Sequence, residues 1–198
     1  MAATGHALPP APPVQRPRVL MVGTAFASAA TVMVFAGLLG VYLSRRDELV
    51  SAGDSWLPED ATIPLQQPNV MLFTLLASAV TVQWAVYAIT RNDRTNTYLA
   101  LGLTFVFGVA FLNMQSYLYT LMEFDITANQ QAVLVYAISG AHVVMVVVAM
   151  VFVALMAFRA LAGQESRRQH DGISAAALFW HATVLVYAVI WLAVYVTK

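Results

Sequence analysis

Five long apolar runs follow one another along the chain, and polar residues gather between them. The runs span about 19–43, 69–90, 98–122, 131–158 and 174–196, and none contains Asp, Glu, Lys or Arg. Each is long enough to cross the hydrocarbon core of a bilayer, which takes about 20 helical residues. Inside lipid, only helices and closed barrels satisfy all backbone polar groups. The pattern therefore predicts an all-α integral membrane bundle of five transmembrane helices.

The composition supports a membrane protein and excludes several other classes. Of the 198 residues, 60% are hydrophobic and 10% are charged, whereas soluble domains carry about 25% charged residues. The formal net charge is zero, so no basic surface for nucleic acid is expected. The chain has no cysteine, which excludes disulfides, iron–sulfur clusters and thiolate chemistry. We therefore expect no nucleic-acid partner and no thiol-based site.

Residues 1–18 form a proline-rich tail ahead of a membrane domain at 19–198. Proline at this density favours an extended segment. Because the number of spans is odd, the two termini lie on opposite sides of the membrane. The side of the tail carries most of the basic residues, namely Arg16, Arg18, Arg91, Arg94, Arg159, Arg167 and Arg168, against Arg45, Arg46 and Lys198 on the other. The positive-inside rule then predicts a cytoplasmic N-terminus and a C-terminus outside.

Two histidines lie within the predicted spans. His142 is in the fourth span, and His181, directly after Trp180, is in the fifth. Two histidines at similar depth on neighbouring helices could ligate one haem, so a small bis-histidine membrane cytochrome is one alternative. The simpler interpretation is that each hydrogen-bonds to a neighbouring helix, or contacts a partner subunit or lipid. Asn113 and Gln115 in the third span can likewise bond across helices.

Four short motifs occur in order along the spans. The first span holds Met33-Val34-Phe35-Ala36-Gly37, similar to the end of Ser-Glu-x-Met-Phe-Phe-Ala-Gly. The segment from Phe111 to Tyr119 is similar to Phe-Leu-x-x-Gln-x-x-Glu-Tyr, and Ser139-Gly140-Ala141-His142 to the start of Thr-Gly-x-His-x-x-His. The fifth span holds Phe179-Trp180-His181, similar to Tyr-Trp-His-Phe-x-Asp. Together these motifs resemble subunit III of the haem–copper oxidases, in the five-helix bacterial form.

The resemblance implies a non-catalytic accessory subunit without a cofactor of its own. Haem and copper are expected in the partner subunits of a hetero-oligomeric complex that contains subunits I and II and passes electrons from cytochrome c to oxygen. The implied location is the plasma membrane of a bacterium, crossed several times. Because the family also binds phospholipid, we expect lipid or subunit contacts at His142, His181, Trp180, Gln115, Arg45, Arg46, Arg91 and Arg94.

The chain departs from the family at four titratable positions of these motifs, while Gln115, His142 and His181 match the family pattern. Thr31 and Leu118 stand where the family has glutamates, Met145 where it has a second histidine, and Val184 where it has an aspartate. A role that depends on the buried glutamate is therefore in doubt, whereas a packing role is not. The alternative within the same family is a subunit III relative that serves a quinol oxidase or a nitric oxide reductase assembly.

Overall fold

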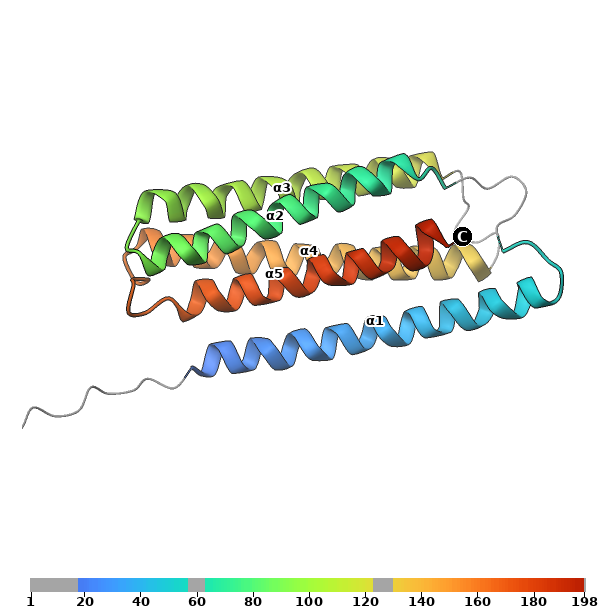
Figure 1. Cartoon of the computed structure of the whole chain (residues 1–198), viewed down its shortest axis with the longest axis horizontal. Coiled ribbons are helices and arrows are strands. Elements are labelled where there is room, and N and C mark those ends of the chain that lie inside the picture. The colour runs from blue at the N-terminus through green and yellow to red at the C-terminus, as the bar shows by residue number, and fades with distance from the viewer. Residues whose placement is uncertain (1–17, 57–62, 123–129, 198) are drawn as a thin grey trace, which may run out of the picture.

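The computed structural model describes residues 18–56, 63–122 and 130–197. Within these ranges five long helices run side by side (Figure 1). They are α1 (Val19–Ser51), α2 (Gln66–Thr90), α3 (Arg94–Leu121), α4 (Gln130–Leu161) and α5 (Asp171–Ile190), which continues as a π-helical segment, η1 (Trp191–Val196). All five are long and apolar enough to cross a membrane, which confirms the predicted fold class. Of the predicted tail, residues 1–17 lie outside the described residues.

The limits of the first helix differ from the predicted span. The apolar run ends at about residue 43, whereas α1 continues to Ser51 through Arg45, Arg46 and Glu48. Charged side chains end an apolar run without ending a helix, because they reach water from the membrane surface. Here Arg45 Nη1 lies 2.8 Å from Glu48 Oε2, and ion pairs at this helical spacing favour the helix. About two turns of α1 therefore extend beyond the apolar run.

Three helices are each followed by one residue in the left-handed region of the Ramachandran plot. These residues are Gly53, Asn92 and Gly163, with φ of 88°, 62° and 76°. This conformation lets the next amide reach back to the last turn, and after α2 the amide of Asp93 does so at 3.0 Å. Asp93 then caps α3, because its carboxylate accepts a hydrogen bond from the Asn96 amide. The α2–α3 connection is therefore short, and the two helices are antiparallel neighbours.

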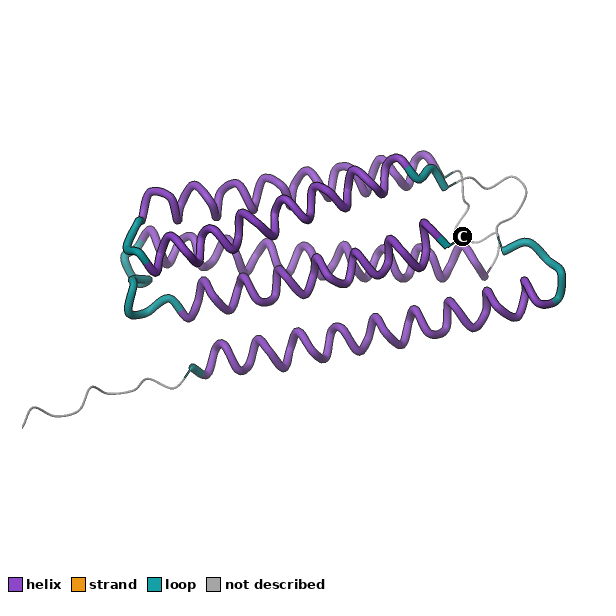
Figure 2. The backbone as a smooth tube through the Cα atoms, in the orientation of Figure 1, coloured by secondary structure: helices purple, strands orange, loops and turns teal. Residues whose placement is uncertain are grey.

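The helices form a bundle with α4 and α5 at its centre (Figures 1 and 2). Helix α5 contacts α1, α2 and α4, while α1 packs on one flank and the α2–α3 pair on the other. The α2–α3 and α4–α5 connections lie at the same end as the start of α1. The predicted topology likewise puts the N-terminal tail and these two connections on one side of the membrane. Which end faces the cytoplasm stays a prediction.

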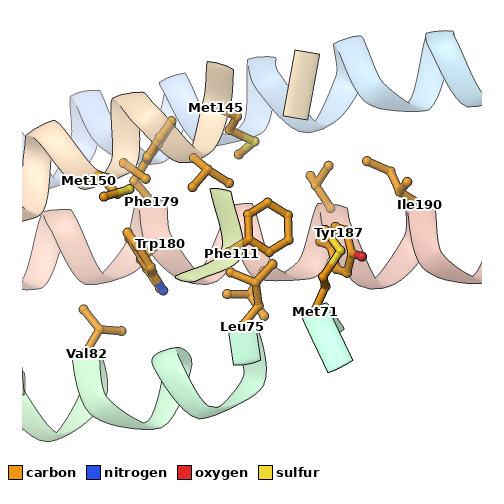
Figure 3. Packing of buried hydrophobic residues seen from close by; sticks show 14 of the residues in the cluster. Met71, Leu75, Val82, Phe111, Met145, Met150, Phe179, Trp180, Tyr187 and Ile190 are labelled. Atoms are coloured by element: carbon orange, nitrogen blue, oxygen red, sulfur yellow. The ribbon is translucent and has the colours of Figure 1, made fainter. Parts of the chain in front are cut away.

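The core is centred on the inner face of α5 (Figure 3). Large side chains fill it, and Trp180, Tyr187 and Phe111 are each at most 1% exposed. Helix α3 approaches α4 and α5 closely at Gly108, where a Cβ would lie within 3.1 Å of Met150 and Trp180 atoms. The interior therefore depends on shape complementarity between aromatic rings, methionines and one glycine.

Candidate functional site

His142 lies in the core, where α1, α3, α4 and α5 meet. Its Nε2 lies 3.0 Å from the backbone carbonyl oxygen of Thr183. A carbonyl only accepts, so Nε2 carries the proton and donates. The imidazole packs against Phe111 and Tyr187, with ring centroids 5.5 and 5.2 Å away, and against Phe35 of α1 at 6.2 Å. These contacts join four helices, so the geometry of His142 fits a packing role.

His181 lies in a different environment, at the surface where α5 meets α2. Its Nε2 is 3.2 Å from Oε1 of Gln83, and Gln83 is exposed on the outside of the bundle. The Nε2 atoms of His142 and His181 are therefore directed at different protein groups, one in the core and one at the surface. The structure does not bring the two histidines together around a common space. This geometry does not support the bis-histidine cytochrome.

Trp180 and Gln115 are both turned into the bundle. Trp180 is fully buried, and its indole Nε1 donates to Ser78 Oγ at 2.8 Å, which ties α5 to α2. Gln115 on α3 is 2% exposed, and its amide nitrogen has no hydrogen-bond partner in the part of the chain that the structure describes. Neither side chain reaches the outer surface of this chain.

The four arginines form two pairs at opposite ends of the bundle. Arg91 and Arg94 flank the α2–α3 turn, and the Arg91 guanidinium lies 4.0 Å from the centroid of the Tyr87 ring, a cation–π contact. Arg45 and Arg46 lie near the C-terminal end of α1. Arg45 pairs with a carboxylate, whereas the Nε of Arg46 is buried and has no partner among the described residues. Guanidinium groups thus occur at both ends, where lipid headgroups meet a membrane protein.

Two of the positions that depart from the family motifs line one groove. Thr31 of α1 and Met145 of α4 face a groove of about 470 Å³, together with Val34, Val148 and Phe179. The Thr31 hydroxyl donates to the Ala27 carbonyl of its own helix at 2.8 Å. The groove therefore presents an apolar surface where the family pattern has a carboxylate and an imidazole.

The other two departures lie elsewhere in the bundle. Leu118 on α3 and Val184 on α5 are 0% and 5% exposed and do not line this groove. Neutral residues thus replace the titratable groups of the family on α3, α4 and α5 as well as on α1. Neutral side chains can be buried without charged partners, which suits a densely packed interior.

Three polar residues that are prominent in the structure are not among the site residues predicted from the sequence. Gln83 and Ser78 bond to α5, and each is a polar residue within an apolar run, a signal that could have been followed. Glu165, in the α4–α5 connection, is 2% exposed, and its Oε1 lies 3.5 Å from Arg159 Nε. Burial raises the pKa of the Glu165 carboxyl, and Arg159 partly offsets this. No sequence pattern distinguishes Glu165 from an exposed loop carboxylate.

Comparisons with known proteins agree with the four motifs. The model of the family described as cytochrome c oxidase subunit III matches residues 14–198. A cytochrome c oxidase subunit 3 from Synechocystis sp. is 30% identical over 181 residues, 90% of this chain and 76% of that protein. The subunit 3 of Pan troglodytes is 28% identical over 93% of this chain and 71% of its own length. That of Chondrus crispus is 26% identical over 86% and 63%. The chain belongs to the cytochrome c oxidase subunit III family.

Proposed function

We propose that this chain is the accessory subunit III of a terminal oxidase that passes electrons from cytochrome c to oxygen. It packs against the catalytic subunit I in a complex with subunit II, binds phospholipid, and lies in a bacterial plasma membrane. Haem and copper reside in the partner subunits. The observation that carries this proposal is the family match over residues 14–198, joined by relatives named cytochrome c oxidase subunit 3.

The distribution of charge in the helices supports a packing role. Charged side chains of the described helices lie only near helix ends, such as Arg94 at the start of α3 and Arg159 near the end of α4. Proton relays and ion pathways across a membrane usually use ionisable groups at depth. The polar groups at depth instead tie helices together, as Thr81 and Thr104 do across α2 and α3 at 2.8 Å.

The Gln83–His181 pair supports a contact face formed by α2 and α5. His181 lies ten residues into α5, about 15 Å along its axis, so the pair is expected within the hydrocarbon region. The Gln83 side chain is exposed, and its Oε1, not its amide nitrogen, is the atom that lies beside His181. Lipid tails offer no acceptor, whereas a helix of subunit I offers side-chain and backbone oxygens. We place the subunit I contact at this pair for that reason.

Affinity purification of the complex from gently solubilised membranes tests the proposal. We expect subunits I and II in the purified material, with the difference spectrum of their haems. Gln83→Leu and His181→Leu should release the catalytic subunit at lower detergent concentration. Asn113→Leu is the matched control, because Asn113 is also an exposed amide within a span but donates to the Val109 carbonyl of its own helix at 3.2 Å.

Three outcomes would change the proposal. Purification without any haem–copper subunit would refute the oxidase role. A quinol oxidase or nitric oxide reductase subunit in place of the expected partners would assign the chain to that assembly. If all three leucine variants retain subunit I equally well, Gln83 and His181 do not belong to the contact face.

A further inference from the structure

One carboxyl group is buried in the connection between α4 and α5, residues 162–170. Glu165 is 2% exposed, whereas Arg167 and most other residues of this connection are exposed. A tight turn follows Glu165, closed by two backbone hydrogen bonds between Ser166 and Gln169 at 2.8 and 3.0 Å. Carboxylates are almost never fully buried unless they are paired, so the surroundings of Glu165 decide what state of the carboxyl this position accepts.

The Glu165 carboxyl lies between α4 and the first turn of α5. A Cβ built at Gly172 would lie 2.6 Å from Glu165 Oε1 and 2.5 Å from Met156 Sδ. The carboxyl and the thioether therefore both reach the backbone of α5 at this glycine. Glu165 Oε2 is buried and has no hydrogen-bond partner among the described residues. Because buried polar atoms are nearly always paired, this position accommodates an ionised carboxylate poorly.

The arginines nearest to the connection compensate only weakly for this burial. Arg159 of α4 places its Nε 3.5 Å from Glu165 Oε1, and its own side chain is 45% exposed. Charge-assisted hydrogen bonds of this type are about 2.7–2.9 Å long, so the pair is a loose one. Arg94 of α3 also reaches the connection, but its Nη1 lies beside Gly163, 3.8 Å from a Cβ built there. The guanidinium groups thus leave the carboxyl without a close donor.

The charged groups at the start of α5 act on Glu165 in opposite directions. His170 attracts a carboxylate at Glu165, whereas Asp171 repels it. Asp171 in turn lies 3.7 Å from Arg18, which directly precedes α1, and both side chains are exposed. A change at Glu165 therefore acts on the residues that join the start of α5 to the start of α1.

We propose that the Glu165 carboxyl is a proton-binding site that holds the α4–α5 connection closed. With its proton bound, the neutral carboxyl stays under Gly172, because burying a neutral group costs far less than burying a charge. Without the proton, the carboxylate moves out to water and the connection opens. The inference concerns the chain itself and does not depend on the oxidase assignment.

The direction of the pH dependence follows from the burial of the carboxyl. Burial raises the pKa of Glu165, Arg159 and His170 lower it, and Asp171 raises it further. The closed connection therefore binds the proton more tightly than the open one, so closure is favoured at low pH and lost as pH rises through the raised pKa. The opening constant should rise by up to about tenfold for each pH unit between the ordinary pKa of 4.5 and the raised pKa.

Hydrogen–deuterium exchange over a pH series tests the proposal on the full chain purified with the subunits that accompany it. The amides of Gly163, Gln164, Ser166 and Gln169 each donate to a backbone carbonyl at 2.8–3.0 Å, so their exchange, divided by the intrinsic rate at each pH, reports opening. The turn between α2 and α3 is the internal control, because the Asp93 amide donates to the Ala88 carbonyl at 3.0 Å at the same end of the bundle. Its protection should not change with pH.

Three variants separate a proton-binding role from a structural one. Glu165→Gln keeps a neutral side chain of the same shape, so the connection should stay protected at every pH. Arg159→Gln should move the opening to higher pH, and Asp171→Asn should move it to lower pH, because these exposed groups act on the carboxyl with opposite charge. Glu48→Gln is the matched control, an exposed carboxylate at the opposite end of the bundle, and should leave the curve unchanged.

The proposal fails if the protection of the connection in the unmodified chain does not change with pH. It also fails if Glu165→Gln keeps the same pH dependence, because the remaining titratable group, His170, would then be the cause. If Glu165→Gln does not fold, the two charge variants still decide, since shifts in the same direction, or no shift in either, exclude Glu165 as the group that titrates. Opposite shifts of the predicted sign support it.

Discussion

Replacing Gly108 by alanine should destabilise the bundle, although alanine is the better helix former. A Cβ at this position would lie 2.8 Å from Met150 Sδ, 2.9 Å from Met150 Cγ and 3.1 Å from Trp180 Cη2. Carbon atoms prefer separations of about 3.5–4.0 Å, so both neighbours must move. Trp180 is held by its hydrogen bond to Ser78, so most of the movement falls on Met150.

The magnitude follows from two opposing contributions. An extra methyl group in a well-packed core typically costs about 1–3 kcal/mol. Glycine to alanine within a helix gains about 0.5–1 kcal/mol. Met150 also borders an apolar groove into which it can shift, which favours the lower part of the overpacking range. We therefore expect Gly108→Ala to lower the free energy of unfolding by about 1 kcal/mol.

Gly102→Ala is the matched control in the same helix. No heavy atom lies within 4 Å of a Cβ built at Gly102, so this variant should keep the helix gain and avoid the overpacking cost. Unfolding of each variant by sodium dodecyl sulfate in mixed micelles, followed by tryptophan fluorescence, measures the difference. If Gly108→Ala is as stable as Gly102→Ala, the close approach of α3 to α4 and α5 is wrong. Combining Gly108→Ala with Met150→Ala should cost less than the sum of the two single changes.

Three further predictions concern polar positions. Thr31→Glu should not increase oxygen consumption by the complex, because the new carboxylate faces an apolar groove and has no family histidine at Met145; a clear gain would contradict this. His142→Phe should lower the free energy of unfolding by about 1 kcal/mol, because the hydrogen bond to Thr183 is lost. It should leave the haem difference spectrum of the complex unchanged, whereas loss of a haem band would make His142 a ligand. Burial raises the pKa of Glu165 above its ordinary 4.5, so the folded state binds the proton more tightly than the unfolded state does. The free energy of unfolding should therefore fall as pH rises from about 4.5 through the raised pKa. Glu165→Gln should remove that slope in thermal melting at a series of pH values, and an unchanged slope would show that Glu165 does not cause it.

Sequence alone determined the membrane class, the number of helices and the family. Hydropathy along the chain is local information, and inside lipid the backbone must satisfy its own hydrogen bonds, so long apolar runs become helices. The loop at residues 91–94 is equally local information, because a loop this short makes α2 and α3 antiparallel neighbours. The end of α1 was the exception, because Arg45 and Glu48 end the apolar run but continue the helix.

Only the tertiary structure decided which way each polar side chain faces. His142 and His181 look alike in sequence, yet one donates to a carbonyl in the core and the other contacts an exposed glutamine. Thr31 and Met145 lie far apart along the chain but share one groove, and a carboxylate in a short loop, Glu165, is buried. These outcomes depend on how each helix is rotated about its axis, and that rotation is set by contacts between large core side chains of different helices, which no single apolar run specifies.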